Sequence, residues 1–400
     1  MPAIPSYPHD IWTDEVLLDP HPHYRELREL GPVVWLEAHQ MYAVSRYAEA
    51  RAVLGDGDTF CSGQGVGLND VINGIGAGTT LMSDGKLHEH LRSVIGPGLT
   101  PRALRSMRDT VQRLATELVG RLVEQGSFDA VADLARALPL TVVPDLVGWP
   151  AGGREHLLDW ASATFDLLGP LNSRAERAIP KAQEMMEFAA RTAADGGIQP
   201  GGLGAAILDA ARRGELEPPQ VPPLIIDYLA PSLDTTISAI SSAIWLLATH
   251  PDQWAALKAD PTMIPNAFNE TVRLESPIRA FSRVATTDTE LAGYAVPAGA
   301  RLIVIYASAN RDERVFDRPD DFDVSRANAA AQLGFGFGTH GCAGQGLARL
   351  EGRAVLQALT DQVQTIELGQ PVRALNNVIS AWDSLPVTVQ PTRRAAVANA

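Results

Sequence analysis

A stretch of ten residues near the C-terminus, Phe-Gly-Phe-Gly-Thr-His-Gly-Cys-Ala-Gly at positions 335–344, constrains this chain most strongly. Gly336 and Gly338 allow the main chain to turn tightly and to approach a bound group closely. An apolar stripe with helical spacing follows, formed by Leu347, Leu350 and Ala354. We therefore expect Cys342 to open a helix, whose N-terminal dipole would stabilise a thiolate.

The pattern suits a cysteine that ligates haem iron. A thiolate ligand pushes electron density toward the opposite face of the iron. It needs a dry pocket and backbone N–H groups that steady the sulfur. In this interpretation Phe335 opens the loop, His340 reaches a haem propionate and Gly344 leaves room for the macrocycle. The alternative is an inert buried cysteine beside a glycine-rich turn.

Cys61 is the only other cysteine, so the sequence predicts neither a disulfide framework nor a zinc cluster. Scarce cysteine fits a reducing compartment. A net charge of −14 argues against a general nucleic-acid surface. The chain begins without a signal-peptide pattern. Its most apolar stretch, 224–249, contains Asp227 and Asp234, which favours a buried helix over a membrane span. We expect a cytoplasmic protein that does not associate with a membrane.

Apolar spacing predicts a mainly helical chain with a small antiparallel sheet. The run 196–204 is too short to separate domains, so we expect one domain over residues 1–400. The glycine-rich run 63–78 lacks a preceding strand and is interpreted as a loop, not a dinucleotide site. A hairpin is expected at 33–44, and strands at 294–297 and 301–306. Helices are expected at 24–30, 101–147, 153–194 with a break near 169–170, 223–249 and 263–275.

Basic residues outnumber acids between Lys86 and Arg113, against the overall charge. One interpretation is a solvated helix face. The other is a docking patch for an acidic partner protein.

With these residues, the sequence resembles the cytochrome P-450 superfamily along its whole length, in particular its soluble bacterial members. The resemblance implies a helix-rich triangular prism with a small antiparallel β part and one haem b, with Cys342 as the axial ligand. It also implies a monooxygenase that uses O2. The sequence has no flavin or nicotinamide motif, so electrons would come from NAD(P)H through a separate ferredoxin or reductase docking near 86–113.

Other family positions follow in order. Glu270 and Arg273 match a Glu-x-x-Arg pair whose role would be to hold the Cys342 loop. His88 and Arg92 resemble a propionate-binding pair, and Arg283 resembles the other propionate partner. Taken singly, each of these residues is equally well read as a surface charge. The prolines usual after Asp84 are replaced here by Gly85 and Lys86.

Asp234 and Thr235 resemble the family's catalytic acid and alcohol, which deliver protons during oxygen activation. The family's small residue and glycine before this pair are here Pro231 and Ser232. A proline inside a helix removes a backbone hydrogen bond and kinks the helix. In the family this helix has a widened groove at the oxygen site. Pro231 is expected to fix that groove more rigidly.

Several stretches look most similar to the subgroup that removes methyl groups from para-substituted methoxybenzoates. In that subgroup, basic or hydroxyl-bearing residues hold the carboxylate of the substrate. The matching positions in this sequence are Gln64, Ile226 and Asp227. An acid there would repel a carboxylate and accept a hydrogen bond from a phenol. Arg279 argues against a phenolic substrate, because it would hold an anion if it faced the pocket. We therefore favour a small methoxylated phenol of the guaiacol type. The expected apolar walls are Phe165, Leu168, Ala230, Ala280 and Phe281.

Three rival functions remain open at this point. The first is hydroxylation of a terpenoid, a steroid or another biosynthetic intermediate. The second is a peroxide-driven haem enzyme, which the Asp234–Thr235 pair disfavours. The third is a haem sensor or carrier without catalysis.

Overall fold

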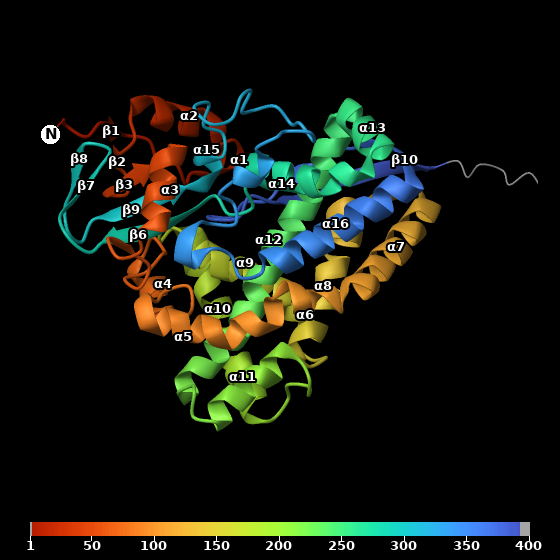
Figure 1. The fold of residues 1–400 in the computed structure, drawn as a ribbon, viewed down its shortest axis with the longest axis horizontal. Helices are drawn as coiled ribbons and strands as arrows, with labels where there is room; N and C mark the ends of the chain where they lie inside the picture. Colours follow the sequence, from red (N-terminus) through yellow and green to blue (C-terminus); the bar gives the residue numbers. More distant parts are fainter. Residues whose placement is uncertain (1, 393–400) are drawn as a thin grey trace, which may run out of the picture.

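A long helix, α12 (Val221–Thr249), runs through the centre of the molecule (Figure 1). Apolar residues occur almost all round it, which is the pattern of a helix covered on every side. The computed structural model describes residues 2–392 and packs four helices closely against α12. They are α8 (Ala137–Val147), α9 (Leu157–Leu168), α10 (Ser173–Ala194) and α14 (Ile264–Glu275).

The remaining long helices complete the helical part of the molecule. Helix α16 follows the Cys342 loop and packs along α7, as Figure 1 shows. The bounds of this group are α5 (Gly85–Ile95), α6 (Pro101–Arg105), α7 (Arg108–Gln125), α11 (Leu203–Arg212), α13 (Pro251–Ala259) and α16 (Gln345–Gln362). Shorter helices are α1 (Asp14–Leu18), α2 (His21–Leu30), α3 (Tyr47–Gly55), α4 (Asp70–Ile75) and α15 (Tyr306–Ala309).

The main sheet has six strands in the order β1-β2-β3-β9-β6-β4 and lies at the opposite side of the molecule from α7 (Figure 1). The pairs β1–β2 and β3–β9 are parallel and the other pairs are antiparallel. Its strands are β1 (Ser6–Tyr7), β2 (Val34–Leu36), β3 (Met41–Val44), β4 (Phe60–Cys61), β6 (Ala280–Ala285) and β9 (Arg301–Ile305).

Three small antiparallel sheets complete the structure. The first has the strand order β10-β13-β5, the second pairs β11 with β12, and the third pairs β7 with β8. Their bounds are β5 (Ser127–Asp129), β7 (Thr289–Leu291), β8 (Tyr294–Val296), β10 (Val363–Leu368), β11 (Val372–Arg373), β12 (Trp382–Ser384) and β13 (Pro386–Pro391).

The hairpin predicted at 33–44 is confirmed as β2–β3, with Val34 opposite Ala43. The helices predicted at 24–30, 223–249 and 263–275 are confirmed as α2, α12 and α14, and the break near 169–170 separates α9 from α10. Within residues 2–392, none of the helices has the length and apolar character needed to cross a membrane.

Two predictions of secondary structure were wrong in detail. The run 63–78 is not all loop, because it contains α4, which the Asn69 side chain caps by accepting the N–H of Ile72. The helix expected over 101–147 is interrupted by β5, because Gly126 ends α7 with φ +84°, a conformation that favours glycine. Both signals are local, and helical apolar spacing alone does not report them.

Candidate active site

The Cys342 loop is built by close backbone approach. Gly338 has φ +70°, and a Cβ there would lie 2.5 Å from the carbonyl oxygen of Leu54, so no other residue fits without movement. The N–H of Cys342 donates to the oxygen of Phe335 at 2.8 Å and closes the loop. Helix α16 begins at Gln345, three residues later than we expected from the sequence. Cys342 therefore precedes the helix and does not open it.

Two effects oppose each other at the Cys342 thiol. Burial raises its pKa, because the charged form loses solvation. The backbone N–H groups of Gly344 and Gln345 lower the pKa, and so do the positive charges of Arg92 and Arg349. The start of α16 thus supplies the backbone donors that a thiolate needs, in agreement with the sequence argument.

Four basic side chains gather beside this loop, as the resemblance implied. The rings of His88 and His340 lie 4.1 Å apart, and Arg92 Nη2 donates to the oxygen of Gly341 at 3.0 Å. Burial, together with the charges of Arg283 and His88, lowers the pKa of His340 to about 4, although Asp84 acts in the opposite direction.

This donor set fits a haem. Nδ1 of His88 is buried and has no hydrogen-bond partner, so it is free to meet a carboxylate. Haem carries two propionates, and Arg92 and Arg283 suit carboxylates through their guanidinium groups. The cluster and the Cys342 thiol come from segments far apart in the sequence, yet Arg92 joins them, because it donates to the Gly341 carbonyl and its charge lowers the pKa of the thiol.

Helix α12 passes over this loop at Ser232. A Cβ placed on Gly344 would come within 4.0 Å of Ser232 Oγ and near no other atom outside its own neighbourhood. The Thr235 hydroxyl donates to the carbonyl oxygen of Pro231 at 2.6 Å, one turn earlier. Because Pro231 has no N–H, the helix also lacks a backbone donor at this turn. The expected alcohol is therefore held in the turn of α12 that follows Pro231, and the helix continues through this proline without a break.

Asp234 is half-buried beside Thr235. Its pKa is raised to about 7, mainly by burial, against the charge of Arg136 and with smaller contributions from Asp166 and Asp159. A carboxyl with this pKa exchanges its proton near neutral pH, which suits a proton carrier.

Glu270 and Arg273 form a fully buried ion pair, as predicted from their spacing. Arg273 Nε donates to Glu270 Oε2 at 2.7 Å and Nη2 donates to Oε1 at 2.9 Å. Arg326 Nε also donates to Glu270 Oε1, at 2.8 Å. Sequence reasoning missed Arg326, because a residue 56 positions away carries no local signal of this contact.

The pair connects to the Cys342 loop through one asparagine. Arg273 Nη1 donates to the carbonyl oxygen of Asn310 at 2.8 Å. Asn310 Oδ1 accepts the N–H of Leu333 at 2.7 Å, two residues before Phe335. This chain of contacts is consistent with the expected structural role of Glu270 and Arg273.

Asp227 lies two turns before Asp234 on α12, beside Thr80. Burial raises the pKa of Asp227 to about 6, although the Thr80 hydroxyl and N–H and the charge of Arg92 lower it. Its Oδ2 is buried without a hydrogen-bond partner. Gln64, expected at the same polar end, has an exposed side chain, and its pocket role stays a prediction. Thr80 was not foreseen, since it lies in an irregular segment.

The expected apolar walls are brought together only in part. Phe165 and Leu168 share one buried cluster, and Phe281 packs against it. Ala230 belongs to the cluster around α12. Ala280 and Phe281 are neighbours on β6, so they lie on opposite faces of the strand, and their role as pocket walls stays a prediction. Phe281 shares its face with Arg283.

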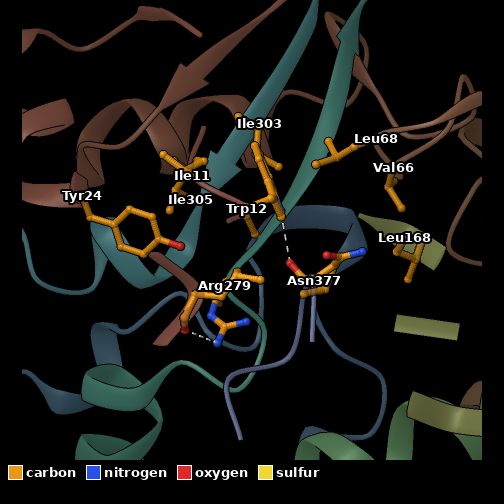
Figure 2. A pocket seen from close by; sticks show the side chains of 13 residues that line it. Ile11, Trp12, Tyr24, Val66, Leu68, Leu168, Arg279, Ile303, Ile305 and Asn377 are labelled. Carbon is orange, nitrogen blue, oxygen red and sulfur yellow. Dashed lines mark hydrogen bonds between the residues drawn. The ribbon is translucent and has the colours of Figure 1, made fainter. Parts of the chain in front are cut away.

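Leu168 and Ala280 do meet at a small cavity shown in Figure 2. Its volume is about 10 Å³, which is room for about one water molecule and not for an aromatic substrate. Figure 2 also shows Trp12, whose Nε1 donates to the oxygen of Asn377 at 3.2 Å. This cavity is a packing gap behind β6.

Arg279 borders the same cavity, as Figure 2 shows, and both of its terminal nitrogens already donate to backbone carbonyls. Nη1 donates to the carbonyl oxygens of Asn376 and Ile379, both at 2.7 Å, and Nη2 donates to that of Leu17 at 3.1 Å. Arg279 is fully buried, and burial lowers its pKa to about 10. Arg279 is therefore a weak argument for an anionic substrate, because these N–H groups already donate to backbone carbonyls.

Two further residues near Cys342 were not foreseen. The guanidinium of Arg349 lies over the ring of Phe335, 4.3 Å from its centroid. Glu351, two residues later on α16, is fully buried with no hydrogen-bond partner for either carboxyl oxygen, and burial raises its pKa to about 8. A charged residue within an apolar helical stripe was the available signal for Glu351.

Comparison with known proteins gives consistent matches. The family model described as Cytochrome P450 matches residues 167–365. Cytochrome p450 CYP199A2 of Rhodopseudomonas palustris is 39% identical over 394 residues, covering 97% of this chain and 95% of that protein. The structure of Mycobacterium marinum cytochrome P450 CYP268A2 in complex with pseudoionone has a TM-score of 0.86 and 30% identity, covering 96% of this chain and 99% of that one. The structure of cytochrome P450 CREJ in complex with (4-ethylphenyl) dihydrogen phosphate has a TM-score of 0.86 and 28% identity, covering 94% and 98%.

Proposed function

This chain belongs to the cytochrome P450 family, and from that premise we propose that it removes the methyl group from a small methoxylated phenol of the guaiacol type. The family assignment makes the protein a monooxygenase that binds haem b and takes electrons from a separate redox partner. The haem supplies the oxygen activation by which one atom of O2 enters a C–H bond. At a methoxy carbon the product is a hemiacetal, which collapses to formaldehyde and a phenol.

We assign the haem-holding roles to residues around the loop. Cys342 would supply the thiolate, steadied by the N–H groups of Gly344 and Gln345. His88, Arg92, Arg283 and His340 would hold the propionates. Phe335, Gly336 and Gly344 would shape the loop against the macrocycle.

Asp234 and Thr235 would handle protons. Asp234 has a pKa near 7 and can carry protons from solvent. The Thr235 hydroxyl, held by the Pro231 carbonyl, would position an ordered water.

The observation that carries the substrate proposal is the buried carboxyl of Asp227. Its Oδ2 lacks a partner, and the terminal nitrogens of Arg279, the cation that would hold an anion if it faced the pocket, already donate to backbone carbonyls. A phenol O–H can donate to Asp227, whereas a benzoate would place a second carboxylate beside it. An unpaired buried carboxylate costs several kcal/mol. Asp227 and Asp234 lie seven residues apart on one helix face, about 10 Å, a span that one substituted aromatic ring can bridge.

Two spectral titrations at pH 7.5 test this proposal. Guaiacol should bind at least tenfold more tightly than 4-methoxybenzoate, a gap of about 1.4 kcal/mol. Guaiacol should also release formaldehyde in a reaction reconstituted with redox partners. In Asp227→Asn the benzoate should gain affinity while haem loading is unchanged. Tighter binding of the benzoate by the unaltered protein would overturn the polar-end argument. Oxidation of substrates without formaldehyde would favour the terpenoid or steroid hydroxylase.

We further propose that an acidic ferredoxin or reductase docks near Lys86–Arg113. Lys86, Arg102, Arg105, Arg108 and Arg113 are exposed along α5 to α7. Arg108 lies close enough to Arg353 on α16 to lower its pKa, so the patch continues onto the helix that follows Cys342. Electrons delivered there would enter on the thiolate side of the site.

A further inference from the structure

A second and larger cavity lies at the far end of α12 from the Thr235 turn. It has a volume of about 280 Å³ and is bordered by Trp245, which lies ten residues, or about 15 Å, beyond Thr235 along the helix. A single water needs only about 10–15 Å³ on this measure. The cavity can therefore hold a small organic molecule, and its lining shares no residue with the site around Cys342.

Three arginines border this cavity, and they share few carboxylates. Arg373 Nη1 lies 2.8 Å from Glu275 Oε2, and Arg311 Nη2 lies 3.8 Å from Oε1 of the same residue. Arg311 Nη1 also pairs with Asp320 at 3.0 Å. Arg279 donates only to backbone carbonyls. Glu275 is the one buried carboxylate of the lining and pairs with two guanidinium groups, whereas the other lining acids, Asp320 and Asp19, reach solvent and Arg279 has no carboxylate partner within the described part of the chain.

The inner wall is also short of hydrogen-bond acceptors. Nη1 of Arg373 is close to Glu275 but not aligned for a hydrogen bond, and Nε of Arg279 has no partner. Nδ1 of His21, another lining residue, is likewise unpartnered. Burial lowers the pKa of His21 well below its usual range, and the charges of Arg311, Arg373, Arg279 and Arg28 lower it further. The charges with the largest effect on His21 are therefore positive, although Asp19, Glu275 and Asp320 also line the cavity.

Apolar side chains form the rest of the wall. Leu246 and Leu274 border the cavity together with the indole of Trp245. Arginines with unsatisfied donors beside an apolar wall match a ligand with an anionic group and an apolar body. We propose that this cavity is a second binding site, for a small carboxylate with an apolar body such as a one-ring aromatic acid.

The site is tested on the full-length, haem-loaded protein saturated with 4-phenylimidazole, which blocks the iron side. Calorimetric titration with benzoate at pH 7.5 and low salt should show one binding event per chain. Benzyl alcohol, its neutral counterpart, should bind at least tenfold more weakly. Arg373→Gln should weaken benzoate binding at least tenfold. Arg191→Gln, an equal charge change on the exposed face of α10, should leave it unchanged.

A second variant keeps the proposal testable if Arg373→Gln does not fold. Asp19 is an exposed acid at the rim of the cavity, so Asp19→Asn removes a negative charge without disturbing the core. It should tighten benzoate binding two- to fivefold. Absence of benzoate binding in the blocked protein would overturn the proposal. So would equal binding of benzyl alcohol, or unchanged affinity in both Asp19→Asn and a folded Arg373→Gln.

Discussion

Removing the Glu270 carboxylate tests how much the buried pair behind the Cys342 loop stabilises the protein. In Glu270→Ala, Arg273 and Arg326 lose the carboxylate that both contact within 2.9 Å. Breaking a buried ion pair from one side costs about 3–5 kcal/mol, because the remaining charge is left uncompensated. Arg273 keeps carbonyl acceptors at Asn310, Pro319 and Asp321, so we expect the lower end, about 3 kcal/mol.

Urea unfolding of the haem-loaded protein, followed by tryptophan fluorescence, measures this loss. For a slope of about 3 kcal/mol/M, the midpoint should fall by about 1 M. Glu187→Ala is the matched control, because Glu187 pairs with Arg191 at 3.6 Å on an exposed helix face. Exposed pairs of this kind contribute about 0.3–0.5 kcal/mol, so its midpoint should barely move. Equal midpoints for the two variants would refute the idea that Glu270 neutralises the buried arginines.

Three other predictions follow from the site. Cys342→Ser should abolish the red-shifted Soret band of the reduced carbon monoxide complex and Cys61→Ser should retain it; a band in the first variant would remove Cys342 as the ligand. Thr235→Ala should still bind haem and substrate but divert reducing equivalents to hydrogen peroxide, and unchanged coupling would point to Ser232. The folded-state pKa of Glu351 is about 8 against 4.5, so folding holds a proton that the unfolded chain releases between these values, and stability falls as pH rises. Glu351→Gln should therefore raise the free energy of unfolding at pH 8 by at least about 1 kcal/mol, with no gain at pH 4.5.

The parts of the site that were predictable from the sequence are those that depend on a few residues close together in the chain. The loop at 335–344 and the i, i+3 spacing of Glu270 and Arg273 both depend on local geometry, and the structure shows that geometry. Helix α12 was predictable for the same reason, since its residues are mostly apolar over its whole length. Local patterns therefore located the thiol, the buried pair and the central helix.

The remaining parts depend on contacts between distant segments. Arg326 reaches Glu270 across 56 residues, and Thr80 reaches Asp227 from an irregular segment. The opposite orientations of Ala280 and Phe281 follow from a strand whose register was not read from the sequence. Arg279 illustrates the same limit, because its partners are backbone carbonyls that any residue supplies.

The contact between Arg92 and Gly341 has a consequence for biosynthesis of the enzyme. It joins residues 249 positions apart, and the expected haem partners also include Arg283, which lies between them in the chain. A ribosome that has released only the first 330 residues has produced His88, Arg92 and Arg283 but no thiolate. Closing so long a loop is also entropically costly and slow. With Cys342 as the proposed ligand, we expect haem capture to be a late event in the life of the nascent chain, and we expect chains terminated before Cys342 to form no haem-thiolate centre.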